Sequence, residues 1–411
     1  MPIVKPFAAL RPRPELAKRI AQPPYDVLSS EEARELAKND PLSFLHVSKP
    51  EIDLPAGTDV HSGEVYRKGA ENFQKLIGDG SLKQDKQKYF YLYQQIMGGN
   101  AQLGLVAVVR CEDYQKSVIK KHEFTQPDKE DDRIRHMEAL NAQTGPVFLT
   151  YRAVPQIDQL LAGVVQTKPW ADFVAPDGVQ HTAWVIENAE TAKKTGNLFA
   201  EIPAFYIADG HHRSAAAVRV FENRKKQSKS PTGNEPWNFF LAVIFPHDQM
   251  QILPYNRVVK DLNGLTTAQF LEKLRHVGIV ESGGQSRPEK KHEICIYVDH
   301  QWHRFHWGKK LVAPQDAVGR LDVSLLQFNV LDRVLGIEDP RRDGRIKFVG
   351  GIRGTAELEK LVNSGEFAAA FSMYPTSISD LMAVADEGRV MPPKSTWFEP
   401  KLRDGLFCHL L

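Results

Sequence analysis

The sequence is poor in cysteine and contains no long hydrophobic segment. Its 411 residues include only Cys111, Cys295 and Cys408, which are far apart and lack the spacing of metal ligands. This excludes a disulfide framework and indicates reduced thiols. The first residues lack the apolar core of a signal peptide, and no later run approaches the length of a membrane span. We therefore expect a soluble, cytoplasmic protein without a membrane segment.

The sequence also lacks an excess of charge of either sign. It has 53 Lys plus Arg and 51 Asp plus Glu, a formal net charge of +2. This balance does not favour a nucleic-acid or membrane surface. Internal repeats, low-complexity segments and heptads are missing as well. Neither a Gly-x-Gly-x-x-Gly turn nor a Ser elbow is present, which argues against a nicotinamide enzyme and an α/β-hydrolase.

What is present is an alternation of apolar, strand-like runs with helix-like segments, typical of an α/β fold. The length is sufficient for two or three domains. We expect a first region over 1–258, a small α+β unit over 259–310 and a C-terminal α/β unit over 311–411. The clearest expected elements are the hairpin of strands 89–97 and 103–111, the strands 147–151, 204–208 and 239–245, the helices 31–38, 64–77, 132–140 and 322–335, and a surface loop over 222–234.

The chain is organised around one short stretch, the strand 204–208 and the turn that follows it. Asp209 is a natural N-cap and Gly210 suits a strained turn, so a helix is expected from about residue 214 to 220. A strand-to-helix turn presents unpaired N–H groups and the positive end of the helix dipole. With His211, His212 and Arg213 beside them, these groups could bind an anion such as phosphate, and Asp209 could hold a metal ion or orient an imidazole. The alternative is a set of polar cap residues at a domain surface.

A second polar stretch lies between residues 120 and 146. His122 and Glu123 give an adjacent base and carboxylate, and Arg133 contributes positive charge. Asp132 and His136 are expected to share one face of a helix. The alternative is a solvated helix with ordinary ion pairs.

Three further residues are candidates because of their positions in the sequence. Asp26 lies in a rigid, proline-set turn, where it either faces a ligand or braces the turn. Arg257 follows an apolar run, where ligand residues of α/β sheets tend to lie. Lys394 precedes two hydroxyl residues, which together resemble half of a phosphate loop without its glycines. The alternative for Lys394 is a packing loop.

Asp209 to Arg213 resembles the phosphate-site signature of the ParB/sulfiredoxin-like superfamily, which includes nucleotide-dependent kinases of free serine. The chain as a whole resembles a prokaryotic family known as domain of unknown function 1015. That likeness runs from Lys5–Pro6–Phe7 through Pro23–Pro24–Tyr25–Asp26–Val27 to Met391–Pro392–Pro393–Lys394–Ser395–Thr396. The resemblance implies a ParB/sulfiredoxin-like core with an additional C-terminal α/β unit.

It also implies a nucleotide-dependent phosphotransfer enzyme acting on a small hydroxyl-bearing, serine-like metabolite, with ATP or ADP and Mg²⁺ as cofactors. Glu123 or Asp26 would take the hydroxyl proton, and Asp209 would hold the metal. The expected nucleotide-binding residues are Gly210, His211, His212, Arg213, His122, Arg133, Arg257 and Lys394. The alternatives are a ParB-type nucleotide switch and a hydrolase of phosphorylated metabolites. The partners expected are this substrate and the nucleotide, and a homo-oligomer stays an open option.

Overall fold

The computed structural model describes residues 1–312 and 316–411 and has a mixed α/β fold. The chain forms two compact units. Unit 1 comprises Met1–Lys120, Thr125–Met250 and Pro400–Leu411, and unit 2 comprises Lys121–Phe124 and Gln251–Glu399. Among the described residues, no helix combines the length and apolarity needed to pass through a membrane. The three cysteines are buried and free.

A nine-stranded sheet forms the centre of unit 1, with the order β6-β11-β8-β12-β5-β4-β10-β9 and β1 added to β5. The pairs β6–β11 and β8–β12 are parallel, and the other pairs are antiparallel. Its strands are β1 (Val4–Lys5), β4 (Phe90–Met97), β5 (Asn100–Arg110), β6 (Ile119–Lys120), β8 (Val147–Tyr151), β9 (Ala171–Val174), β10 (Gln180–Ile186), β11 (Phe205–Asp209) and β12 (Phe239–Pro246). Two short pairs, β2 (Leu10–Pro12) with β3 (Leu82–Gln84) and β7 (Ala142–Gln143) with β21 (His409–Leu410), lie outside this sheet.

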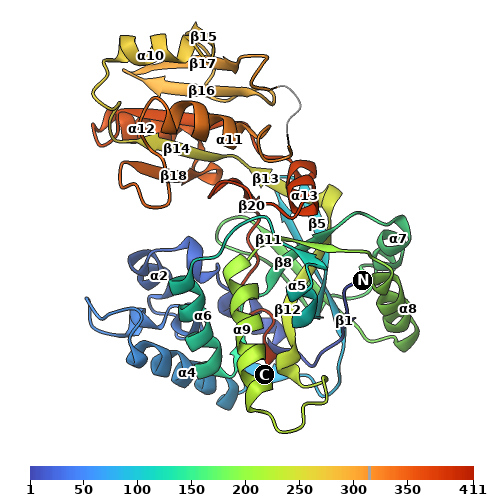
Figure 1. Ribbon diagram of the computed structural model, residues 1–411. Helices are drawn as coiled ribbons and strands as arrows, with labels where there is room; N and C mark the ends of the chain where they lie inside the picture. The colour runs from blue at the N-terminus through green and yellow to red at the C-terminus, as the bar shows by residue number, and fades with distance from the viewer. Residues whose placement is uncertain (313–315) are drawn as a thin grey trace. The chain divides into compact units, whose positions relative to one another are not determined.

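One face of this sheet packs against helices. Leu105, Leu149 and Ile244 of its strands share a core with Ile157 and Ala216 from the helices. Helices α6 and α9 pack side by side, as Figure 1 shows. The helices of unit 1 are α1 (Ala17–Ile20), α2 (Ser30–Ala37), α3 (Leu45–Ser48), α4 (Gly63–Gly78), α5 (Cys111–Gln115), α6 (Pro127–Leu140), α7 (Pro155–Val164), α8 (Ala189–Ala200) and α9 (His211–Gln227).

The last residues of the sequence pack on unit 1. The ring of Phe407 contacts Tyr91 and Tyr93 of β4, with ring centroids 5.4 and 6.2 Å away. The backbone of Asp404 exchanges two hydrogen bonds with that of Gln22. Unit 1 is thus completed by Pro400–Leu411, which follow unit 2 in the sequence.

Unit 2 is built on a six-stranded antiparallel sheet with the order β15-β17-β16-β19-β14-β18. Its strands are β14 (Tyr255–Val259), β15 (Gly278–Ser282), β16 (Glu293–Val298), β17 (Gln301–Trp307), β18 (Ile346–Gly350) and β19 (Ala369–Met373), and β13 (Gln251–Leu253) pairs separately with β20 (Trp397–Glu399). Its helices are α10 (Thr267–Arg275), α11 (Asp322–Leu326), α12 (Gly354–Asn363) and α13 (Ile378–Asp386), and a π-helical turn (Gln327–Asp332) continues α11.

The two units of the structure divide the chain differently from the three regions expected from the sequence. Residues 259–310 and most of 311–411 belong to one unit, because β16 from the former region pairs with β19 from the latter. The expected hairpin is confirmed as β4 and β5, and the strand 147–151 as β8. The expected loop over 222–234 is wrong in its first part, because α9 continues to Gln227. In this part of the helix, Lys225 forms an ion pair with Glu112.

Candidate functional site

The central turn connects β11 to the seventeen-residue helix α9. Gly210 adopts φ 91° and ψ 31°, a left-handed conformation that glycine tolerates best. Gly210 is therefore the residue before the helix, and the expected role of Asp209 as the N-cap is wrong. The Asp209 carboxylate has other contacts: Oδ2 accepts a hydrogen bond of 3.0 Å from Arg213 Nη2, and Oδ1 lies 3.7 Å from Lys401 Nζ.

Arg213 supports the turn from within. Its side chain is 4% exposed, and Nη1 donates to the backbone oxygen of Pro146. Burial disfavours the charge, but the carboxylates of Asp26, Asp209 and Asp404 outweigh this cost and raise the pKa of Arg213. Its guanidinium also packs against Gly210, where a Cβ would lie 3.1 Å from Arg213 Nε. The structure therefore gives Arg213 several intramolecular partners around the turn.

The two imidazoles of the motif differ. His211 is buried, and its backbone oxygen accepts a hydrogen bond from Ser214 Oγ. His212 is half-buried, and its Nε2 accepts a hydrogen bond of 3.1 Å from the backbone N–H of Gln126. Because its Nε2 accepts a hydrogen bond, the His212 ring is neutral and carries its proton on Nδ1. His212 thus connects the first turn of α9 to the residue that precedes α6.

A second arginine and a tyrosine stand beside Arg213. A cavity of about 20 Å³, the size of one water molecule, borders both arginines. The guanidinium of Arg133 lies 3.7 Å from the centre of the Tyr25 ring and pairs with Asp132. The cavity is lined by Tyr25, Ser48, Arg133, His136, Met137, Thr144, Gly145, Arg213 and Asp404. Arg133 and Arg213, which are far apart in the sequence, therefore belong to one buried polar cluster, and the carboxylate of the exposed Asp26 attracts the Arg213 charge.

Asp404 is the acidic residue of this cluster that the sequence did not reveal. It is 2% exposed, and Oδ1 has no hydrogen-bond partner among the described residues. Burial raises the pKa of Asp404 to about 7, against the opposing attraction of Arg213 and Arg133. Nothing in the local pattern around Asp404 indicated this role. Tyr25, by contrast, adjoins the candidate Asp26 and could have been found with it.

The residues around Asp132 have structural partners. Asp132 Oδ1 accepts a hydrogen bond of 2.7 Å from the Tyr66 hydroxyl and lies 3.1 Å from His61 Nδ1. His136 is buried with Nε2 2.8 Å from the backbone oxygen of Val47, and burial lowers the pKa of His136 to about 4. His136 is thus a neutral, buried residue at neutral pH.

Four of the predicted residues belong to unit 2. His122 and Glu123 lie in the short segment Lys121–Phe124. The His122 backbone oxygen accepts a hydrogen bond of 2.8 Å from the N–H of Met391, and His122 Nε2 lies 3.4 Å from Thr396 Oγ1. Arg257 Nη2 donates a hydrogen bond of 3.1 Å to the backbone oxygen of Lys394. The loop around Lys394 therefore contacts both His122 and Arg257.

A family model described as "Protein of unknown function (DUF1015)" matches residues 4–324 of the chain. No curated protein matches the chain significantly.

Solved structures of low identity also match. A conserved hypothetical protein from Pyrococcus furiosus is 14% identical, with a TM-score of 0.37 over 74% of this chain and 95% of its own. A free serine kinase in complex with AMP is 14% identical, with a TM-score of 0.36 over 71% and 86% of the two chains. A C-terminally truncated SbnI from Staphylococcus aureus is 13% identical, with a TM-score of 0.38 over 74% and 87%.

Proposed function

The chain belongs to the DUF1015 family, whose description states no activity, and we propose that it is a nucleotide-dependent phosphotransfer enzyme. The proposed acceptor is a small, serine-like metabolite with a hydroxyl group. One observation carries the proposal: the left-handed Gly210 places two histidines and the N-terminus of a seventeen-residue helix directly after a buried strand. Such a helix start favours phosphate through its backbone N–H groups and its dipole.

The contacts described above divide the roles among the motif residues. His211 and His212 belong to the first turn of α9 and are proposed to bind the phosphates together with its amides. Arg213 is 4% exposed and bonded to Asp209 and Pro146, so we assign it the positioning of this turn. Removal of Arg213 would then weaken phosphate binding indirectly. Arg133 lies in the same buried cluster and is assigned the same supporting role.

Asp209 is the proposed ligand for Mg²⁺. Its Oδ2 accepts a hydrogen bond from Arg213, and Lys401 Nζ lies 3.7 Å from its Oδ1. A carboxylate oxygen is the ligand type that Mg²⁺ prefers, so the chemistry of this residue fits the ion. Bound there with the phosphates, Mg²⁺ would neutralise charge that develops during transfer.

In the proposed reaction, the acceptor hydroxyl oxygen forms a bond to the terminal phosphorus of ATP or ADP. The bond from that phosphorus to the bridging oxygen breaks, and the nucleotide leaves with one phosphate fewer. The hydroxyl proton passes to a carboxylate, for which Glu123 is the first candidate and Asp26 the second. Phosphoryl transfer depends mainly on positioning and charge neutralisation, and the polar groups gathered at the turn can supply both.

The test begins with the melting temperature of the full chain in the presence of ATP, ADP, CTP, GTP or pyrophosphate, each with and without Mg²⁺. A ligand that binds only the folded protein raises this temperature. We expect a rise with at least one nucleotide and a smaller rise in His212→Ala. Lys226→Ala is the matched control, because it removes an exposed charge from the opposite end of α9.

The nucleotide found in this way is then incubated with L-serine and other hydroxyl compounds, and phosphorylated products are measured by ³¹P NMR. Product formation supports the phosphotransferase. Binding without turnover of any acceptor supports the nucleotide-switch alternative instead, and phosphate release from phosphorylated metabolites supports a hydrolase. If no nucleotide or pyrophosphate raises the melting temperature, the proposed phosphate site is wrong.

A further inference from the structure

Unit 2 contains a buried arginine without an acidic partner. Among the described residues four arginines are buried, namely Arg133, Arg213, Arg257 and Arg403. Arg133 pairs with Asp132, Arg213 with Asp209, and Arg403 with Asp177. Arg257 is 3% exposed, and none of its contacts with the described residues involves a carboxylate. A buried charge without a counter-charge is costly and is rarely retained without a reason.

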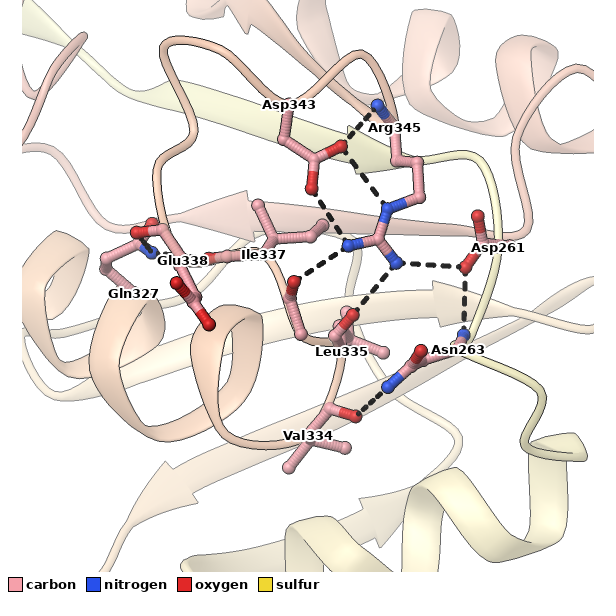
Figure 2. A network of polar contacts seen from close by, with 10 residues as sticks. Asp261, Asn263, Gln327, Val334, Leu335, Ile337, Glu338, Asp343 and Arg345 are labelled. Atoms are coloured by element: carbon pink, nitrogen blue, oxygen red, sulfur yellow. Dashed lines mark hydrogen bonds and ion pairs between the residues drawn. The ribbon is translucent and has the colours of Figure 1, made fainter.

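Arg345, the residue before β18, is an arginine of the same unit whose contacts are those of a structural residue. Its guanidinium bonds to Asp343 at 2.8 Å and to the backbone oxygens of Leu335 and Gly336 at 3.0 and 2.9 Å. Figure 2 shows Arg345 with Asp343 and Leu335. Asp261 adds a second carboxylate at 3.5 Å. Arg345 therefore has two negative charges and two backbone acceptors, and its role in the fold is accounted for.

Arg257 has a different environment. It donates to the backbone oxygens of Tyr255 and Lys394, and its guanidinium lies 5.4 Å from the centre of the Phe348 ring. Two of its five N–H donors are used in these bonds. Burial lowers the pKa of Arg257 to about 10, and the side chain is still charged at neutral pH. The charge is thus bordered by carbonyl groups and an aromatic ring, which carry no full negative charge.

The residue that accepts one of these hydrogen bonds carries a second positive charge. Lys394, whose backbone oxygen accepts from Arg257, has its Nζ 5.7 Å from the centre of the Tyr255 ring. Lys394 also adopts φ 55°, a left-handed conformation that is rare for a residue with a side chain. Strained residues of this kind cluster at ligand-binding positions. The buried Arg257 is therefore bonded to the backbone of a residue that carries a second positive charge.

We propose that Arg257 and Lys394 form an oxyanion-binding site within unit 2 that takes a carboxylate or phosphate group of a small molecule. The planar guanidinium suits either group through paired hydrogen bonds, and the ammonium adds a second charge. The ligand supplies the negative charge that the chain itself does not place beside Arg257. This inference goes beyond the proposed function, because it proposes an anion site in unit 2 in addition to the phosphate turn of unit 1.

The test uses the full chain, with dissociation constants for inorganic phosphate, acetate and L-serine measured by calorimetry at constant ionic strength. For at least one of these probes, Arg257→Met is expected to weaken binding by about 10- to 100-fold, the scale of hydrogen bonds to a charged group. Lys394→Met changes an exposed side chain, so it keeps the proposal testable if Arg257→Met does not fold; binding should weaken by about 3- to 10-fold, the scale of a single exposed charge. Lys347→Met, which removes an exposed charge from β18 of the same unit, is the matched control and should bind as the unchanged protein does.

The three probes identify the ligand group. A loss restricted to phosphate assigns a phosphate site, and a loss with acetate or L-serine assigns a carboxylate site. His212→Ala separates this site from the turn of unit 1: the proposed function predicts that it weakens nucleotide binding, whereas binding at Arg257 is expected to persist. The proposal is overturned if all three probes bind Lys394→Met and a folded Arg257→Met as they bind the unchanged protein, or if none binds the unchanged protein.

Discussion

The carboxylate of Asp404 lies directly against Gly145, so that a Cβ at residue 145 would come within 2.5 Å of Asp404 Oδ1. Atoms do not approach so closely, and an added methyl group must displace the carboxylate or the backbone. Residue 145 is therefore restricted to glycine by the neighbouring carboxylate of Asp404. The same carboxylate borders the cavity shared by Arg133 and Arg213.

Gly145→Ala is therefore expected to destabilise the protein by about 1–3 kcal/mol, the usual cost of overpacking. Urea unfolding measures the change. Gly163→Ala is the control, because Gly163 lies in α7 with nothing within 4 Å of its added Cβ. That substitution should be neutral or stabilising by up to about 1 kcal/mol, since alanine favours a helix. Equal effects of the two substitutions would contradict the close contact.

The buried Asp404 should make stability depend on pH. Its pKa is about 7 in the folded chain and about 4 in an unfolded one, so between these values the folded state binds the extra proton. The contribution of Asp404 to stability is therefore fully present below pH 4 and is lost as the pH rises through 7. Over this range the loss amounts to a few kcal/mol at most, roughly 1.4 kcal/mol per pKa unit.

Asp404→Asn isolates this effect from that of the buried histidines, which act in the opposite direction because their pKa values are lowered. Between pH 5 and 8, we expect the free energy of unfolding to rise less, or fall more, in the unchanged protein than in the variant. Urea titrations at several pH values measure the difference. Parallel curves for the two proteins would show that Asp404 titrates normally.

Gly210→Ala should affect both stability and nucleotide binding. Alanine is strained at φ 91°, and its Cβ would lie 3.1–3.3 Å from the guanidinium of Arg213. The strain alone costs about 1–2 kcal/mol. Gly178→Ala imposes similar strain at φ 81° in the turn between β9 and β10, where nothing lies within 4 Å. Only the Gly210 variant is therefore expected to lose the nucleotide-induced rise in melting temperature, and loss of that rise in both variants would point to global damage.

The two candidate bases, Glu123 and Asp26, can be distinguished by measuring stability together with turnover. Glu123→Gln should keep nucleotide binding and lose turnover by at least about 100-fold, the scale of general-base catalysis. Asp26→Asn should lower the melting temperature as well, because Asp26 is the first of the carboxylates that stabilise the Arg213 charge. Turnover and melting temperature are measured for both variants. Full activity of Glu123→Gln would transfer the role of base to Asp26.

Features determined by neighbouring residues could be predicted well from the sequence. Ser29 and Glu32 form a capping box at the start of α2, and the continuous apolar run 147–151 forms β8. The left-handed turn at Gly210 followed from glycine chemistry. The end of α9 was missed because its polar residues resemble a loop, and the pairing of Lys225 with the distant Glu112 is not visible in the local sequence.

Candidate residues could likewise be chosen from the sequence where neighbouring residues mark them. Asp26, Arg133 and Arg213 were chosen from local patterns, and the structure places the two arginines in one buried cluster, with the carboxylate of the exposed Asp26 attracting the Arg213 charge. Asp404 and Lys401 were not found, because their role depends on a return of the chain to unit 1 that no nearby residue encodes. Likewise, Arg257 was expected from its position after an apolar run, but only three-dimensional contacts reveal that it lacks an acidic partner.

The return of the chain to unit 1 determines when this cluster can form during protein synthesis. Residues 400–411 leave the ribosome after all of unit 2 has been translated, and they bring Asp404 and Lys401. Until then a nascent chain has α9 and Arg213 but lacks the carboxylate of Asp404 beside them and the ammonium of Lys401 near Asp209. The polar cluster of unit 1 is therefore completed only after unit 2 has been translated.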